Sequence, residues 1–177
     1  PSAGAPNVVL APVTSSLSCT NTLVTVSISS TTTPISYAWS GPTITSGNTT
    51  GTITVSQGGS YSYTVTNTTN SCTTIGNQSV VQNTTAPTTT ASATGALTCT
   101  NPSVNLNSTL AGMNYTWTAP AGGSVGSANA QSTSASGGAG TDSLNVIDPS
   151  NGCAYATTTS VTQNTTVPTG LNAGSNQ

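Results

Sequence analysis

The chain has 177 residues and almost no charge, with no Lys, Arg or His and only two acidic residues. An ordinary globular domain is about 25% charged, so the whole surface is unusual. Without cations the chain has no basic contacts for phosphate, which excludes nucleic acid and electrostatic binding to anionic membranes. No stretch approaches the roughly 20 apolar residues that span a bilayer, so no membrane insertion is expected in this segment.

Residues 1–16 are expected to form an N-terminal arm or linker, with one short apolar run at residues 8–10. The first six residues have neither a basic start nor an apolar run, so they do not form a signal peptide. We therefore expect the chain to be a mature or internal fragment.

Residues 17–87 carry clear strand signals, because apolar and polar residues alternate and turn residues separate the runs. The expected strands centre on residues 24–28, 35–39, 53–55, 61–65 and a last run ending at 80–81. No segment has a helical period. The many Thr residues fit this interpretation, since Thr is β-branched. A disordered, mucin-like stalk is the alternative, and the ordered Val/Ile alternation, Trp and Cys argue against it.

The same pattern returns about 80 residues later. Leu17-Ser-Cys19-Thr-Asn21 reappears as Leu97-Thr-Cys99-Thr-Asn101, and Tyr37-Ala-Trp39 as Tyr115-Thr-Trp117. We assign residues 88–96 to a linker and first strand, 97–168 to the second repeat and 169–177 to the start of the next linker. Six or seven short strands in each repeat predict an all-β chain of two tandem Ig-like/PKD-like β-sandwich domains. The sequences at the two ends of the chain lead us to expect that it is a segment of a longer array of such repeats.

Four cysteines allow three pairings. Because each pair is duplicated with the repeat, we predict Cys19–Cys72 and Cys99–Cys153, one disulfide in each domain. Small domains need such crosslinks, and a closed loop of about 53 residues stabilises by roughly 4 kcal/mol in the entropy model. Paired cysteines indicate an oxidising, extracellular compartment.

The residue inventory predicts no enzyme, with no catalytic residue, no metal site and no cofactor. No His, Lys or Glu is present to activate a Ser or Thr. Asp142 and Asp148 are expected to be surface or turn carboxylates, since the first repeat has Tyr61 and Asn67 in their places. A weak calcium site at Asp148 and Asn151 is a minor alternative.

The aromatic pairs Tyr37/Trp39 and Tyr115/Trp117 each lie on one strand face, and we expect them in the core. A sugar-stacking platform is the alternative. Candidate glycosylation sites are the sequon residues Asn48, Asn67, Asn77, Asn83, Asn107, Asn114 and Asn164. Ser143, in Asp142-Ser143-Leu144, resembles the O-glycosylation signal of Bacteroidota.

These motifs together resemble the tandem Ig/PKD-like repeats of Bacteroidota cell-surface adhesins, the SprB type used in gliding motility. The motifs are Leu-Thr-Cys-Thr-Asn, Tyr-x-Trp, Asn-Gly-Cys and Val-Thr-Gln-Asn-Thr-Thr-x-Pro, in residues 17–87 and 97–168. The first repeat departs from this pattern with Asn70-Ser-Cys72. The resemblance implies export to the cell surface, commonly by type IX secretion, and a long filamentous stalk.

The leading hypothesis is a structural repeat segment of a long extracellular adhesin or surface filament. Its expected partners are neighbouring repeats or identical chains, with surface polysaccharide as a further candidate. One alternative is a pilus-like subunit whose untethered N-terminal arm or last strand pairs with a neighbour by β-strand addition. The other is a carbohydrate-binding module that uses Trp39 or Trp117.

Overall fold

The computed structural model describes residues 4–166, and its regular secondary structure in that range consists of strands alone. The predicted all-β, Ig-like sandwich fold is confirmed. None of the described residues forms a helix that is long and apolar enough to cross a membrane.

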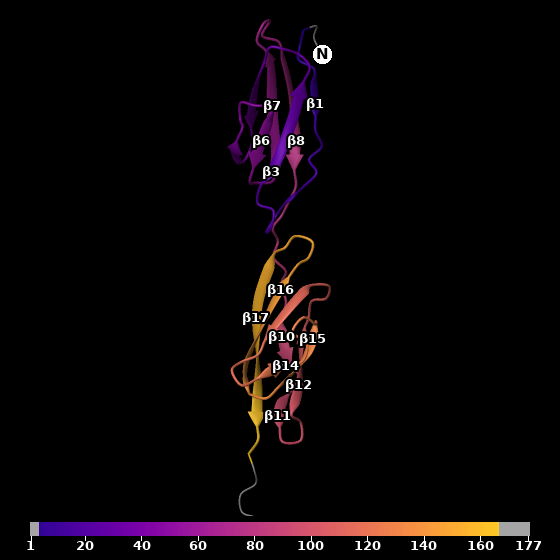
Figure 1. Cartoon of the computed structure of the whole chain (residues 1–177), viewed down its shortest axis with the longest axis vertical. Coiled ribbons are helices and arrows are strands. Elements are labelled where there is room, and N and C mark those ends of the chain that lie inside the picture. The colour runs from indigo at the N-terminus through magenta and orange to yellow at the C-terminus, as the bar shows by residue number, and fades with distance from the viewer. Residues whose placement is uncertain (1–3, 167–177) are drawn as a thin grey trace, which may run out of the picture. The chain divides into compact units, whose positions relative to one another are not determined.

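The chain forms two compact units (Figure 1). The first contains the segment up to Thr85 together with the three residues Asn151–Cys153, and the second contains Ala86–Ser150 and the chain after Cys153. The second sequence repeat therefore contributes one short turn to the first unit.

The first unit is a sandwich of two sheets with a short parallel pair. One sheet has the order β1 (Val8–Leu10), β3 (Val24–Ser30), β6 (Thr52–Val55), β5 (Ile44–Ser46). The other has the order β4 (Ile35–Ser40), β7 (Gly59–Asn67), β8 (Thr73–Val80). In addition, β2 (Leu17–Ser18) pairs in parallel with β9 (Gln82–Asn83). This strand order is that of a constant-type Ig sandwich.

Strict alternation along the strands builds the core of the first unit. Val24, Val26 and Ile28 on β3 are buried, and the polar residues between them face outward. On β4, the Trp39 ring packs edge to face on Tyr63, with ring centroids 5.4 Å apart. The period-2 pattern in the sequence therefore correctly predicts which side chains of these strands face the core.

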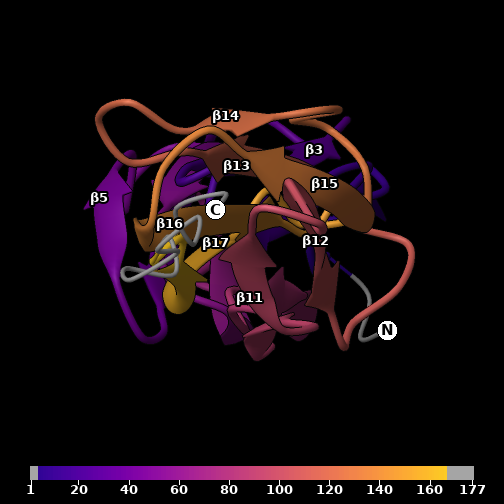
Figure 2. The ribbon, with the colours of Figure 1, turned by 90° about the horizontal axis from the view of Figure 1, so that it is seen from below.

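The second unit has the same strand order. One sheet runs β10 (Ala91–Ala93), β12 (Ser103–Ser108), β15 (Ser132–Ser136), β14 (Ser124–Val125). The other runs β11 (Ala96–Thr98), β17 (Ala154–Asn164), β16 (Gly140–Ile147), β13 (Asn114–Thr118). In Figure 2 the sheet that contains β14 and β15 lies over β16 and β17.

The middle of the second repeat, residues 119–140, is rich in Gly, Ala and Ser, and it contains the strands β14 and β15. On β15 the buried residues are Thr133 and Ala135, which alternate with exposed serines. Both buried side chains are small, so hydropathy alone does not reveal the alternation.

The N-terminal arm is tethered, which corrects the premise of the pilus-like alternative. β1 pairs antiparallel with β3, with Val8 opposite Ser30 and Leu10 opposite Ile28. β10 pairs with β12 in the same way in the second unit. The short apolar run at residues 8–10 is therefore an edge strand of its own unit.

Two isoleucines of the first unit test this assignment of the core. Ile53 is fully buried, whereas Ile75 is 70% exposed. Ile53→Ala should lower the free energy of unfolding by about 2–5 kcal/mol, because it leaves a cavity. The matched variant Ile75→Ala should change it by about 0.5 kcal/mol or less. Denaturant unfolding monitored by Trp fluorescence measures both, and equal losses would contradict the assigned strand faces.

Candidate functional site

The disulfide joins Cys19 to Cys153, residues 134 positions apart. All four cysteines lie within residues 4–166, and Cys72 and Cys99 are free there. The predicted pairs Cys19–Cys72 and Cys99–Cys153 are therefore wrong, as is the expectation of one disulfide in each domain.

Strand geometry explains the error. Cys19 follows β2, which pairs with β9 beyond the end of β8, whereas Cys72 precedes the start of β8. The eight residues of β8 span about 27 Å at 3.4 Å per residue. A disulfide needs Cα atoms within about 7 Å, so the two cysteines of the first repeat cannot meet.

The second repeat has the same obstacle. Cys99 follows β11, which pairs with Thr162–Asn164 at the end of β17, while Cys153 directly precedes the start of that strand. The eleven residues of β17 span about 37 Å at 3.4 Å per residue, so these two cysteines cannot meet either.

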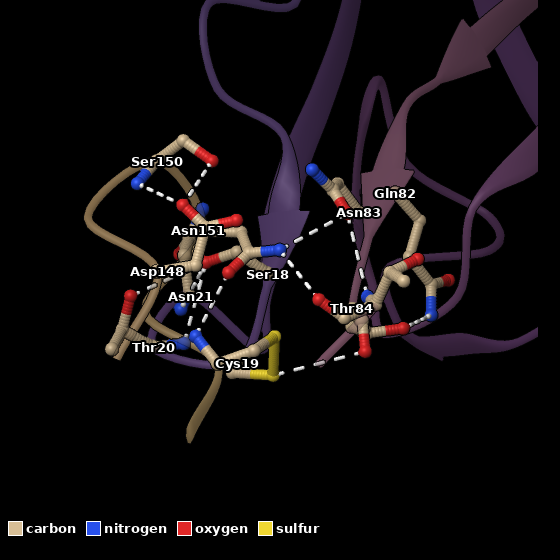
Figure 3. The surroundings of a disulfide bond; sticks show 12 residues. Ser18, Cys19, Thr20, Asn21, Gln82, Asn83, Thr84, Asp148, Ser150 and Asn151 are labelled. Carbon is tan, nitrogen blue, oxygen red and sulfur yellow. Dashed lines mark hydrogen bonds between the residues drawn. A yellow bond between two sulfur atoms is a disulfide. The ribbon is translucent and has the colours of Figure 1, made fainter. Parts of the chain in front are cut away.

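Cys19 lies in a tight hydrogen-bonded turn, residues 18–21, which we call the first cysteine turn (Figure 3). The backbone N–H of Ser18 donates to the Asn21 carbonyl at 2.9 Å, and the Asn21 N–H donates to Ser18 Oγ at 3.0 Å. The hydroxyls of Ser18 and Thr20 are 3.3 Å apart. These bonds fix the backbone that presents the Cys19 sulfur.

The segment Asn151–Cys153, which we call the second Asn-x-Cys turn, binds beside it. The buried Asn151 amide donates to the Thr85 carbonyl at 2.9 Å and to Asn83 Oδ1 at 3.1 Å. Its Oδ1 accepts from the Cys153 N–H at 2.9 Å, and its carbonyl accepts from the Cys19 N–H at 3.1 Å. The Asn151 side chain therefore positions Cys153 with both its amide nitrogen and its amide oxygen.

Gly152 has a sequence requirement of its own. Its φ is +70°, in the left-handed region that favours glycine. A Cβ at this position would lie 2.4 Å from Thr20 Cγ2. The sequence Asn-Gly-Cys thus fits the first cysteine turn both by hydrogen bonding and by its lack of a side chain.

The aromatic residues that a sugar platform would expose lie largely in the cores. Trp39 and Trp117 are 7% and 2% exposed, and their indole N–H groups donate to the carbonyls of Thr50 and Ala130. Tyr115 is also buried, while Tyr37 packs at the margin of the first core.

Asp142 is buried, contrary to the expectation of a surface or turn carboxylate. It is 1% exposed, and neither carboxylate oxygen has a hydrogen-bond partner among the described residues. Desolvation raises its pKa above the ordinary 3.8. In the first unit the matching position holds the buried Tyr61, whose hydroxyl donates to the Gln57 carbonyl. The second unit thus has a carboxylate where the first has a hydrogen-bonded tyrosine.

Asp148 lies in a turn, as expected. Its Oδ1 accepts from the Ser150 hydroxyl at 2.7 Å and from the Ser150 N–H at 2.8 Å, and these bonds lower its pKa. The Asn151 side chain is committed to Thr85, Asn83 and Cys153, so the minor calcium alternative lacks that ligand. Within residues 4–166 no three His, Cys, Asp or Glu side chains gather as a metal site.

The candidate glycosylation residues differ in accessibility. Asn67 and Asn107 are half-buried, and Asn67 donates to the Gly4 carbonyl. The exposed candidates are Asn48, Asn77, Asn83, Asn114, Asn164 and Ser143. Asn83 also accepts a hydrogen bond from Asn151, so a glycan there would compete with the second Asn-x-Cys turn.

No protein-family model matches the chain, and no curated protein matches it. Among solved structures it is similar to murine CEACAM1b, with 13% identity and a TM-score of 0.39 over 89% of this chain and 100% of the other. It is also similar to the S-layer protein rSbsC(31-844), with 11% identity and a TM-score of 0.43 over 93% of this chain and 29% of the other. All of these TM-scores are below 0.5, so the fold assignment rests on the strand order and cores described above.

Asn151 and its counterpart Asn70 test the arrangement around the disulfide. Asn151→Ala should lower the free energy of unfolding by about 1–3 kcal/mol, because it leaves the buried Cys153 N–H and the Thr85 carbonyl without these partners. Asn70 is exposed, so Asn70→Ala should cost about 0.5 kcal/mol or less. Urea unfolding of the oxidised chain measures the difference, and the reverse order would contradict the assigned contacts.

Asp142 should make stability depend on pH. Because its pKa is raised in the folded state, the folded chain binds that proton more tightly than the unfolded chain. Stability should be greatest below the ordinary pKa of 3.8 and fall as the pH rises through the raised value. The lowered pKa of Asp148 acts in the opposite sense, and its contribution is already complete above the ordinary pKa.

Urea unfolding between pH 4 and pH 7 measures this effect. Asp142→Asn should remove the loss of stability with rising pH, and the control Asp148→Asn should retain it. A wild-type chain that is as stable at pH 7 as at pH 4 would contradict the assigned burial of the Asp142 carboxylate.

Proposed function

We propose that this chain is a tension-resisting repeat segment of a long extracellular adhesin or surface filament. The observation that carries the proposal is the bond between Cys19 of the first sequence repeat and Cys153 of the second. A disulfide inside one repeat stabilises that repeat alone. A bond between successive repeats crosslinks those repeats to each other in addition to the backbone that joins them.

The connectivity determines what tension can extend. A force applied at the two chain ends passes from Cys19 through the disulfide to Cys153. The residues between these two cysteines are then outside the covalent path and are not pulled apart. In the entropy model, closing a loop of 134 residues also stabilises the folded chain by about 5 kcal/mol. Such a chain suits a stalk that must hold its length under load.

The composition fits an exposed stalk outside the cell. A disulfide of this kind persists in oxidising compartments, and a chain without Lys or Arg offers no site for trypsin-like proteases. The low charge also allows neighbouring repeats or identical chains to associate. Adhesion to surface polysaccharide and a part in gliding motility are the finer roles that the family resemblance adds to this proposal.

The two alternative functions have less support. The pilus-like alternative needs a free donor strand, whereas β1 pairs with β3 of its own unit. The carbohydrate-binding alternative needs an exposed aromatic face, whereas both Trp side chains are buried.

Single-molecule extension tests the proposed function. The chain is tethered at both ends and pulled, first oxidised and then in the presence of a phosphine reductant. Because the bonded cysteines are 134 positions apart, reduction should add about 450 Å to the fully extended length at roughly 3.4 Å per residue.

A Cys72→Ser variant is the control and should keep the short oxidised length. The proposal is overturned if the oxidised wild-type chain extends as far as the reduced one. It is also overturned if the short length is lost in the control.

A further inference from the structure

The second unit carries a copy of the site that holds Cys153 in the first. In the copy, the Thr98 N–H donates to the Asn101 carbonyl at 2.9 Å, and the Asn101 N–H donates to Thr98 Oγ1 at 2.9 Å. The hydroxyls of Thr98 and Thr100 are 3.3 Å apart. The residues 98–101, the second cysteine turn, therefore repeat these three contacts of the first cysteine turn, with Cys99 in the place of Cys19.

The neighbouring strand end is repeated as well. In the first unit β2 pairs in parallel with β9, and Leu17 lies opposite Gln82. In the second unit β11 pairs in parallel with the end of β17, and Leu97 lies opposite Gln163. Asn164 accepts from the Thr166 N–H as Asn83 does from the Thr85 N–H, both at 3.4 Å. The acceptors that hold Asn151 in the first unit thus have counterparts in Asn164 and Thr166.

The first site holds Asn151 and Cys153, whereas no residue among 4–166 takes their place at the second. In the first unit Asn83 and Thr85 receive the Asn151 amide, and Cys19 is bonded to Cys153. In the second unit Cys99 is exposed and free. In the first unit these groups bind an Asn-x-Cys turn. The matching groups of the second unit are therefore suited to a partner of the same chemistry.

We propose that Cys99, Asn164 and Thr166 form a docking and disulfide site for the Asn-x-Cys turn of a further repeat. This inference rests on the proposed function and names the partner at one end of the segment. The amide of the incoming Asn donates to Asn164 and Thr166, and its carbonyl accepts from the Cys99 N–H. The incoming cysteine then pairs with Cys99.

Asn70–Cys72, the first Asn-x-Cys turn, supplies the complementary half. The Cys72 N–H donates to Asn70 Oδ1 at 3.0 Å, as the Cys153 N–H does to Asn151. The Asn70 amide donates to the Gly4 carbonyl at 3.1 Å, and Gly4 precedes Thr85 by the same 81 positions that separate the two turns. Cys72 is thus presented for the cysteine turn of a preceding repeat, and Cys99 for the Asn-x-Cys turn of a following one.

The bond forms by thiol–disulfide exchange. The Cys99 thiol loses its proton, and the thiolate attacks the sulfur of an incoming cysteine that is already in a mixed disulfide with a small thiol. The new S–S bond forms as the old one breaks, and the small thiol leaves with the electron pair and is protonated. The mixed disulfide is the oxidant.

The residue between Asn and Cys should determine how well each turn fits. In the first unit a Cβ on Gly152 would lie 2.4 Å from Thr20 Cγ2. Thr100 is the counterpart of Thr20, so a turn with Gly fits the second cysteine turn without adjustment. A turn with Ser, as in Asn70-Ser71-Cys72, must displace the Thr100 side chain. An Asn-Gly-Cys turn is therefore the better partner.

Peptide exchange tests the proposal on the full chain. Three peptides with the sequence of residues 148–155 carry their cysteine as a mixed disulfide with glutathione, and have Asn-Gly-Cys, Ala-Gly-Cys or Asn-Ser-Cys. Each reacts with the Cys72→Ser chain, whose remaining free thiol is Cys99. Mass spectrometry gives the rate of adduct formation.

The Asn-Gly-Cys peptide should react with Cys99 about tenfold faster than the Ala-Gly-Cys peptide, because the latter lacks the amide hydrogen bonds. The Asn-Ser-Cys peptide should react at an intermediate rate and recover in a Thr100→Ser chain. The Cys99→Ser chain is the control, and its Cys72 should show no preference. Equal rates at Cys99 for the first two peptides would overturn the inference. They would leave the extension experiment intact, since it depends on Cys19 and Cys153 alone.

Discussion

One constraint determines the covalent structure of this protein: in each repeat the two cysteines lie at opposite ends of one long strand. β8 separates Cys72 from Cys19, and β17 separates Cys153 from Cys99. No pairing within a repeat is possible at that distance. A disulfide partner for either cysteine has to come from another repeat, as Cys153 of the second repeat does for Cys19 of the first. The crosslink is thus a property of the array.

Neutral hydrogen bonds fix the chain where charged side chains usually would. Asn151 positions Cys153 through its amide, and each cysteine turn is closed by hydroxyl and backbone groups. These bonds are insensitive to salt, unlike ion pairs at a surface. The exception is Asp142, a buried carboxylate that has no hydrogen-bond partner within residues 4–166 and stands where the first unit uses Tyr61. That difference makes the second unit the pH-sensitive one.

The sequence predicted the fold better than the site. Alternation of Val, Ile and aromatic residues located β3, β4, β6 and β7, because buried large side chains leave a clear period-2 signal. The strands built from small residues, such as β15, leave no such signal. The disulfide pairing was beyond the sequence, since it depends on the parallel pairing of β2 with β9. The requirement for Gly152 depends on its approach to Thr20. The one sequence signal for this requirement was the difference between Ser71 and Gly152 at the middle of the two Asn-x-Cys turns.

Disulfide mapping of the native chain tests the central claim most directly. The chain lacks sites for trypsin, but chymotrypsin cleaves after Leu, Tyr and Trp, and digestion without reductant keeps S–S bonds intact. The account predicts one crosslinked species that joins residues 18–23, which contain Cys19, to residues 145–155, which contain Cys153. Residues 64–97 and 98–106 should be recovered with Cys72 and Cys99 as thiols when monomer is analysed. A crosslink of residues 18–23 to residues 64–97 would contradict the account.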